Sequence, residues 1–313
     1  MTNMEQKTAP DPRTARASRK RTRKSPRHSA TPGRPERFAA GDAVESISKA
    51  GPYRESTNGI RHRFVVHSDN PRRRSPFIQL VESWMAPDAD MFGMHPHRGF
   101  ETVTLVLKGS ERYRDHLGTE GLAQAGDVQW TRAARGILHS SKPEGDEPLH
   151  VLQLWLNLPA SMKSAEPRTC GQRLAETAAS DDDGVQVIVH AGEYQGRVQP
   201  HLSLWALALI EAKLAAERSV TLRADPTWRS FVYVITGEIR IGGRTVSEGE
   251  VAWIGSSGAL DPGVRAETAE GAHVVFYSSP PIDEPVAVRG PFVMNTKDEI
   301  RQAYADLSNG TFI

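Results

Sequence analysis

The sequence predicts an all-β protein that is built from two similar halves and ends in one short helix. From about residue 41, short runs of β-forming residues are separated by Gly, Asp and Pro at intervals of about eight to twelve residues, which is typical of sandwiches and barrels. The order of strand and turn signals then occurs a second time, which indicates an internal repeat. Helical spacing is confined to the C-terminus.

The first half contains three clear strand signals. Residues 101–107 (ETVTLVL) alternate, residues 126–130 (GDVQW) begin a second strand after a turn, and residues 150–156 (HVLQLWL) form a third. Residues 159–184 are rich in Pro, Ser and Asp, so we expect a loop there, with the linker between the two halves at residues 166–184.

The second half repeats this order. Residues 228–235 (WRSFVYVI) and 239–241 (IRI) correspond to the first strand signal, and residues 249–254 (GEVAWI) correspond to the second. The C-terminus differs, because residues 296–299 (TKDE) form a capping box that is followed by apolar residues on one helical face and then by Gly310. We expect a helix of about ten residues there.

Charge separates a basic leader from a mildly acidic body. Residues 1–37 carry eleven Lys and Arg against three acids, whereas the remainder carries 28 basic and 35 acidic residues. The leader has almost no large apolar side chain, so we expect residues 1–40 to be disordered, either as a solubilising extension or as a weak contact for nucleic acid or an import receptor. We place a first barrel at residues 41–165, a second at 185–290, and a C-terminal strand and helix at 291–313.

Other features of the composition exclude several classes of protein. The longest apolar run, residues 202–210, is far too short to span a bilayer, so we expect no membrane segment. The single cysteine, Cys170, excludes an internal disulfide and suits a reducing compartment, which predicts a cytoplasmic protein. The chain lacks both the Gly-Lys-Ser/Thr phosphate loop and the dinucleotide-binding fingerprint.

Three histidines form the strongest candidate for a chemical site. His95 and His97 are two residues apart, so on a β-strand their side chains project from the same face. His139 follows a glycine about forty residues later, and on a neighbouring strand it would complete three sides of a metal site. The second half has residues 226–228 (PTW) in place of the histidine pair, so we expect no metal ligands there.

Five motifs extend this pattern along the chain. They are residues 95–104 (HPHRGFETVT), 126–130 (GDVQW), 135–139 (RGILH), 152–158 (LQLWLNL) and 290–296 (GPFVMNT). In these residues and in their order, the chain resembles the pirin family of bicupins over most of positions 41 to 313. The resemblance implies two double-stranded β-helix (jelly-roll) barrels, a metal site in the first barrel, usually of iron, and a second barrel without a metal.

The resemblance also implies which residues bind the metal. In the family, the two histidines of the first motif, the histidine after the glycine turn and a glutamate two residues later hold the ion, and these positions are His95, His97, His139 and Ser141. A serine hydroxyl is a poorer ligand than a carboxylate and leaves the ion without nearby negative charge. Glu101 lies an even four residues past His97, so on a continuous strand it would share that face, either as a compensating ligand or as a hydrogen-bond partner of a ligand histidine.

The resemblance implies a metal-dependent dioxygenase similar to the family's quercetin 2,3-dioxygenases, with Fe(II) as the cofactor and another divalent metal as the alternative. A small planar phenolic substrate would coordinate the metal, and Glu101 would orient a ligand or deprotonate the substrate. The competing hypothesis is a non-enzymatic regulator that binds a transcription factor or a metabolic enzyme, with a structural or redox-sensing metal or none. The serine at position 141 favours the regulator. In both cases we expect a monomer.

Overall fold

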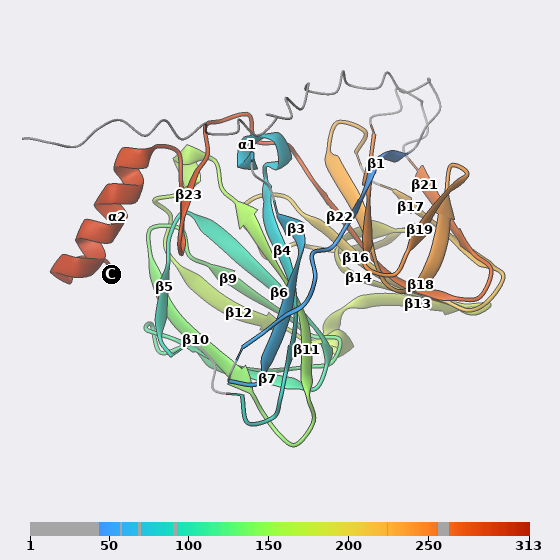
Figure 1. The fold of residues 1–313 in the computed structure, drawn as a ribbon, viewed down its shortest axis with the longest axis horizontal. Helices are drawn as coiled ribbons and strands as arrows, with labels where there is room; N and C mark the ends of the chain where they lie inside the picture. The colour runs from blue at the N-terminus through green and yellow to red at the C-terminus, as the bar shows by residue number, and fades with distance from the viewer. Residues whose placement is uncertain (1–43, 57, 68–69, 90–92, 224, 256–262) are drawn as a thin grey trace, which may run out of the picture. The chain divides into compact units, whose positions relative to one another are not determined.

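The computed structural model describes residues 44–56, 58–67, 70–89, 93–223, 225–255 and 263–313. In this part of the chain, antiparallel strands form two barrels, and a short helix ends the chain (Figure 1). The predicted all-β fold with two barrels and a C-terminal helix is therefore confirmed. The basic leader lies outside the described residues, so its disorder stays a prediction.

The first barrel consists of a seven-stranded sheet and a four-stranded sheet. The strands predicted from residues 101–107, 126–130 and 150–156 are all present in the larger sheet. In sheet order, the larger sheet contains β12 (Arg168–Gln172), β9 (Val128–Arg132), β6 (Phe100–Lys108), β11 (Leu149–Asn157), β4 (Phe77–Met85), β3 (Ile60–His67) and β2 (Arg54–Glu55). The smaller sheet contains β5 (His95–His97), β10 (Ile137–Pro143), β7 (Ser110–Asp115) and β8 (Glu120–Gln124).

The second barrel is a branched sheet of eleven strands. Its main path is β1 (Val44–Lys49), β20 (Glu250–Ile254), β18 (Arg229–Ile241), β22 (Ala272–Ser279), β16 (Ala208–Leu214), β14 (Val185–Tyr194) and β13 (Ala178–Asp182). Its branches are β15 (Arg197–Gln199), β17 (Arg218–Arg223), β19 (Arg244–Ser247) and β21 (Gly263–Thr268). The two strand signals at 228–235 and 239–241 belong to the single long strand β18.

The connection between the barrels differs from the predicted loop. Residues 159–184 are not a continuous loop, because they contribute β12 to the first barrel and β13 to the second, besides two 3-10 turns at Ala160–Met162 and Leu174–Glu176. Strands β12 and β13 are edge strands, which tolerate the polar composition that suggested a loop. In addition, β1 pairs with β20 of the second barrel, although its position in the sequence placed it in the first.

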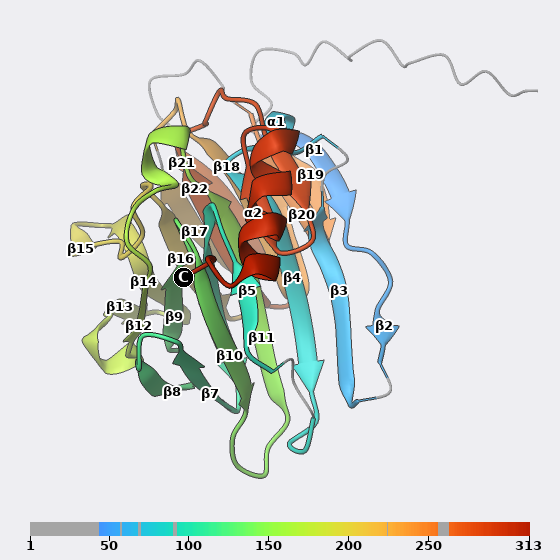
Figure 2. The same cartoon turned by 90° about the vertical axis from the view of Figure 1, so that its left-hand side faces the viewer.

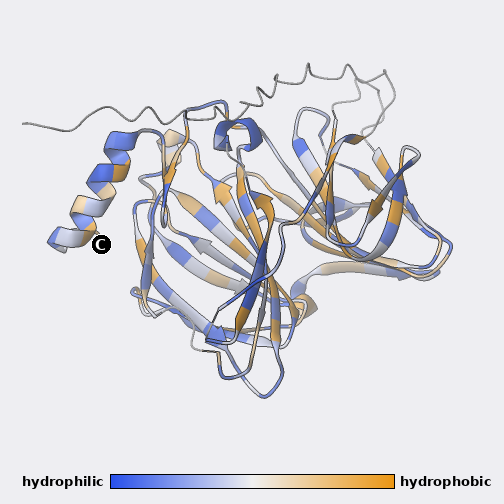
Figure 3. Ribbon diagram, in the orientation of Figure 1, coloured by the Kyte–Doolittle hydropathy of each residue, from blue (hydrophilic) through white to orange (hydrophobic). Residues whose placement is uncertain are grey.

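A shared apolar core lies between the barrels. Alternate residues of β6 and β11, including Leu105 and Leu154, pack in one buried cluster with Phe231 and Leu209 of the second barrel. The alternation of apolar and polar positions along the strands is visible in Figure 3. The remaining faces of β6 and β11 are thus free to line the interior of the first barrel.

A polar network also connects the two barrels. Glu82 of β4 accepts hydrogen bonds from Arg63 Nε and from the Tyr233 hydroxyl of β18, each at 2.6 Å. The Nε2 atom of His150 lies 2.8 Å from the other carboxylate oxygen. Burial raises the pKa of Glu82, but these hydrogen bonds and the charge of Arg63 outweigh burial and lower it to about 2.

The C-terminal segment packs against the first barrel. It contains the hairpin of β23 (Ala287–Arg289) and β24 (Phe292–Met294) and the helix α2 (Lys297–Asn309). Helix α2 faces the viewer in Figure 2. Helix α1 (Pro71–Arg74) is a single turn. Arg98 donates to Asp306 of α2 at 2.5 Å, and Val293 N donates to Arg98 O at 3.0 Å. The predicted capping box at Thr296 and the stop at Gly310, with φ +73°, are confirmed. Within the described residues, no helix is both long and apolar enough to cross a membrane.

Candidate metal centre

Two adjacent strands bring the three predicted histidines together. Strand β5 pairs with β10 so that His95 lies opposite His139 and His97 lies opposite Ile137. The ring centroids of His95 and His139 are 4.5 Å apart, and the other two pairs of rings are each 4.9 Å apart. One ring nitrogen of each histidine belongs to a set of three nitrogens that all lie within 4.8 Å of one another. The predicted convergence of the three side chains is therefore confirmed.

Hydrogen bonds fix which nitrogen of two rings faces the cluster. His97 Nδ1 lies 3.3 Å from the carbonyl oxygen of Pro291, and His95 Nδ1 lies 3.0 Å from that of Gly93. A carbonyl oxygen only accepts hydrogen bonds, so each Nδ1 donates and the lone pair of the neutral ring is on Nε2. The C-terminal segment thus orients a histidine of the first barrel through Pro291.

Burial keeps all three rings neutral. Desolvation and the neighbouring His95 lower the pKa of His97 to about 3, and desolvation lowers the pKa values of His95 and His139 as well. Neutral imidazole is the form that binds a metal ion, because protonation blocks the lone pair. At neutral pH the cluster is therefore in its ligand form.

His139 is the residue of the cluster whose surroundings best fit a bound cation. Its side chain is buried, and neither ring nitrogen has a hydrogen-bond partner among the described residues. An unsatisfied buried polar group costs about 1–3 kcal/mol, which a bond to a metal ion would remove. Three neutral imidazoles fit a divalent transition metal and leave further coordination positions for substrate or water.

Aromatic side chains cover one side of the cluster. The rings of Phe100 and Trp155 lie 5.1 and 5.2 Å from that of His97, and 4.3 Å from each other. Both residues belong to the seven-stranded sheet, on β6 and β11. They provide an apolar wall that limits access of water to His97.

The prediction that Glu101 shares a face with His97 is wrong. Gly99, with φ +90°, lies where the chain crosses from the four-stranded to the seven-stranded sheet, so the two residues are not on one continuous strand. On β6, Glu101 lies opposite Leu156, which belongs to the core between the barrels. The adjacent residue Trp155, which points to the other side of the sheet, is the one that contacts His97.

Glu101 instead connects the two barrels. Its carboxylate accepts hydrogen bonds from Leu204 N at 3.0 Å and from Arg132 Nε at 3.3 Å. Burial raises its pKa to about 7, although these contacts oppose the rise. The buried carboxyl group is thus held by the second barrel and by β9.

Ser141 lies on the strand that carries His139, and its binding to a metal stays a prediction. It follows His139 by two residues on β10 and therefore shares its face. The sequence analysis missed the neighbour of Ser141, the buried Glu111 of β7. Burial raises the pKa of Glu111 to about 7, and a hydrogen bond from Ser141 opposes the rise. The strict alternation of residues 110–115 (SERYRD) could have indicated that Glu111 is turned inward.

Three histidines outside the cluster have structural partners. His116 Nδ1 accepts a hydrogen bond from Leu138 N at 3.1 Å. In the second barrel, His190 and His273 each contact one oxygen of Glu211, at 3.2 and 2.8 Å. These rings therefore serve packing and hydrogen bonding.

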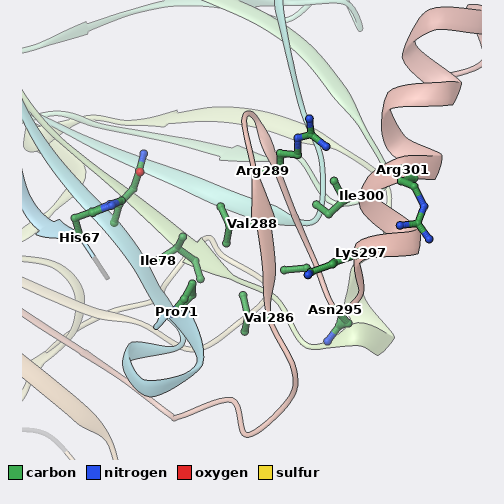
Figure 4. Close-up of a pocket in the computed structure, with 12 residues that line it drawn as sticks. His67, Pro71, Ile78, Val286, Val288, Arg289, Asn295, Lys297, Ile300 and Arg301 are labelled. Atoms are coloured by element: carbon green, nitrogen blue, oxygen red, sulfur yellow. The ribbon is translucent and has the colours of Figure 1, made fainter. Parts of the chain in front are cut away.

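A cavity of about 870 Å³ lies beside the C-terminal helix (Figure 4). Its lining includes Ile78 of β4, Val286 and Val288 at β23, and Lys297 and Ile300 of α2. None of the three clustered histidines lines it, so this cavity is separate from the candidate metal centre.

The fold and the site define a bicupin with a three-histidine cluster in its first barrel. The chain belongs to the pirin family. Two family models match it, Pirin over residues 56–156 and the Pirin C-terminal cupin domain over residues 209–313.

Named relatives agree with this assignment. The chain is 34% identical to human Pirin over 263 residues, which cover 82% of this chain and 90% of the human protein. It is 36% identical to a pirin-like protein of Solanum lycopersicum over 239 residues, which cover 75% of this chain and 81% of that protein. The solved structure of a quercetin 2,3-dioxygenase from Acinetobacter baumannii matches with a TM-score of 0.76 and 26% identity, covering 86% of this chain and 97% of that one.

Proposed function

We propose that the protein binds one Fe(II) ion through His95, His97 and His139 and uses O₂ to oxidise a flavonol-type phenol. The observation that carries the proposal is the buried His139 ring. Its two nitrogens have no partner among the described residues, and its centroid lies 4.5 and 4.9 Å from those of two other neutral imidazoles. The named activity of the Acinetobacter baumannii relative supports a flavonol as the substrate class.

The side chains around the cluster suit this chemistry. When bound, the metal would act as a Lewis acid on a phenolic oxygen and supply a site for O₂. The backbone carbonyl of Pro291 holds the His97 ring in its ligand tautomer. Phe100 and Trp155 exclude water on one side, which favours oxidation of a planar aromatic substrate over competing hydrolysis or proton leakage.

Oxygen consumption tests this proposal. The protein is loaded with Fe(II) under anaerobic conditions and then transferred to aerated buffer. It should consume O₂ there when quercetin is added. The variant His139→Ala should consume none, whereas His67→Ala, which changes an exposed histidine outside the cluster, should behave as the wild type. Equal oxygen consumption by the wild type and His139→Ala would contradict the proposal.

A second candidate function is regulation through a protein partner. Ser141 favours it, because the position lacks the carboxylate that would offset the charge of the metal and accept a substrate proton. This function predicts protein that retains one metal ion but shows no flavonol-dependent oxygen uptake. The same oxygen assay, run with metal analysis, separates the two functions.

For either function we propose a monomer in the cytoplasm. Cys170 is the single cysteine, so the chain cannot form an internal disulfide and suits a reducing compartment. Light scattering of the purified protein tests the monomer, and fractionation of cells tests the compartment.

A further inference from the structure

Glu111 is a buried carboxylate on the same face of the sheet as the histidine cluster. Strands β7 and β10 pair so that Glu111 lies opposite Pro143, Tyr113 opposite Ser141, and Asp115 opposite His139. Directly paired residues project from the same side of a sheet, so all of these side chains face the interior of the first barrel. The Glu111 side chain therefore points into the barrel that holds the three histidines.

This carboxylate has few contacts that explain its burial. Glu111 is 2% exposed, and among the described residues its Oε2 atom has no hydrogen-bond partner. Its neighbour on β8 is the buried Ala123, and the polar side chain that contacts it is Ser141. A buried carboxylate without a cation is costly, which argues that Glu111 has a role other than stability.

Asp115 shows the contrast. It also has one oxygen without a partner among the described residues, but its other oxygen accepts hydrogen bonds from Leu117 N and Thr119 N. Asp115 thus holds the turn between β7 and β8. Glu111 has no comparable bonds to the backbone.

We propose that Glu111, on the neighbouring strand, balances the charge of the metal centre without binding the ion itself. The inference rests on the proposed binding of a divalent metal by the three histidines, which brings two positive charges and no negative ligand. Ser141 is the residue that leaves the ligand set without a carboxylate. Glu111 is the buried carboxylate that contacts Ser141, whereas Asp115, which lies opposite His139, is held by the backbone of its own turn. Glu111 acts as a positioning and charge-balancing group around the metal, and metal affinity is the property that depends on it.

Titration of metal-free protein with Co(II), followed by visible absorption, tests this proposal. Loss of a group that supports metal ligands typically weakens metal affinity about 10- to 100-fold, so Glu111→Gln should raise the Kd for Co(II) by about that factor. The matched control is Glu144→Gln, which removes an exposed carboxylate that pairs with Arg112 just after β10. This control should leave the Kd unchanged.

Thermal unfolding of the metal-free proteins separates this role from a structural one. Glutamine keeps an acceptor for the Ser141 hydroxyl and removes an unpaired buried charge, so Glu111→Gln should not lower the Tm. A lower Tm with an unchanged Kd would overturn the proposal and assign Glu111 a structural role. A Kd within about twofold of the wild type would overturn it as well.

A double variant shows whether the two positions share one function. If Glu111 supplies the charge that Ser141 does not, Ser141→Glu should make Glu111 redundant. The loss of affinity caused by Glu111→Gln should then disappear in the Ser141→Glu background, and an equal loss in both backgrounds would contradict the proposal. Wild-type protein that binds no Co(II) would refute the proposed metal centre itself. Wild-type protein that binds Co(II) with the same Kd as Glu111→Gln would refute only the role of Glu111.

Discussion

Removal of the Glu82 carboxylate should strongly destabilise the protein, because this group connects the two barrels. Glu82 is 2% exposed and accepts hydrogen bonds from Arg63 and from Tyr233 of the opposite barrel. Its pKa falls from an ordinary value of 4.5 to about 2 in the folded protein. A difference of that size corresponds to about 3 kcal/mol of folding free energy at neutral pH. We therefore expect Glu82→Gln to lose about 3 kcal/mol, which agrees with the 3–5 kcal/mol typical of breaking a buried ion pair.

The pH dependence of this loss identifies Glu82 as its source. Because the pKa is lower in the folded than in the unfolded protein, the contribution is complete above about pH 4.5 and is lost as the pH falls towards 2. Urea unfolding at several pH values should show wild type and Glu82→Gln differing by about 3 kcal/mol at pH 7 and converging near pH 2. The control Glu144→Gln, which removes one partner of a surface ion pair, should differ from the wild type by less than about 1 kcal/mol at every pH. A difference for Glu82→Gln below about 1 kcal/mol at pH 7, or one independent of pH, would refute the reasoning.

Three further predictions concern Ser141, Gly99 and the basic leader. Ser141→Glu should increase the iron that the purified protein retains, because it places an anionic oxygen two residues from His139 on the same strand face; unchanged metal content would contradict this. Gly99→Ala should destabilise the protein by more than about 1 kcal/mol, since Gly99 has φ +90° and a Cβ there would overlap the carbonyl oxygen of Val293; thermal unfolding measures the loss, and an unchanged Tm would be evidence against it. Deletion of residues 1–37 should change neither the Tm nor the metal content, because the segment has little apolar surface to contribute to a core, and a drop of several degrees would show that it docks.

Local patterns in the sequence predicted the elements that depend on local physics. The alternation in residues 101–107 identified β6, and the capping box at Thr296 identified α2. Predicting that His95 and His97 converge required only that residues two apart on a strand face the same way. The structure satisfies that condition. These features follow from the geometry of one strand or one helix.

Features that depend on distant pairing could not be predicted in this way. The pairing of β1 with β20 joins segments about two hundred residues apart, and no local pattern selects that partner. The side on which Glu101 lies depends on the change of sheet at Gly99. Because of this change, the even spacing between His97 and Glu101 does not place them on one face. The Pro291 carbonyl reaches His97 because the C-terminal hairpin packs on the first barrel.

The role of Glu111 required both kinds of information. Its inward direction follows from the alternation along β7, whereas its position beside Ser141 follows from the register of β7 against β10. The proposed compensation for Ser141 therefore depends on strand pairing, which no local pattern in the sequence specifies.

Metal analysis of protein produced without a histidine tag tests the central claim most directly. The account predicts about one iron ion per chain in the wild type and none in His139→Ala, because that variant removes one of the three imidazoles that meet within 4.8 Å. His67→Ala should retain the wild-type amount. Equal metal content in the wild type and His139→Ala, or no metal in the wild type after incubation with Fe(II), would contradict the claim that this cluster is a metal centre.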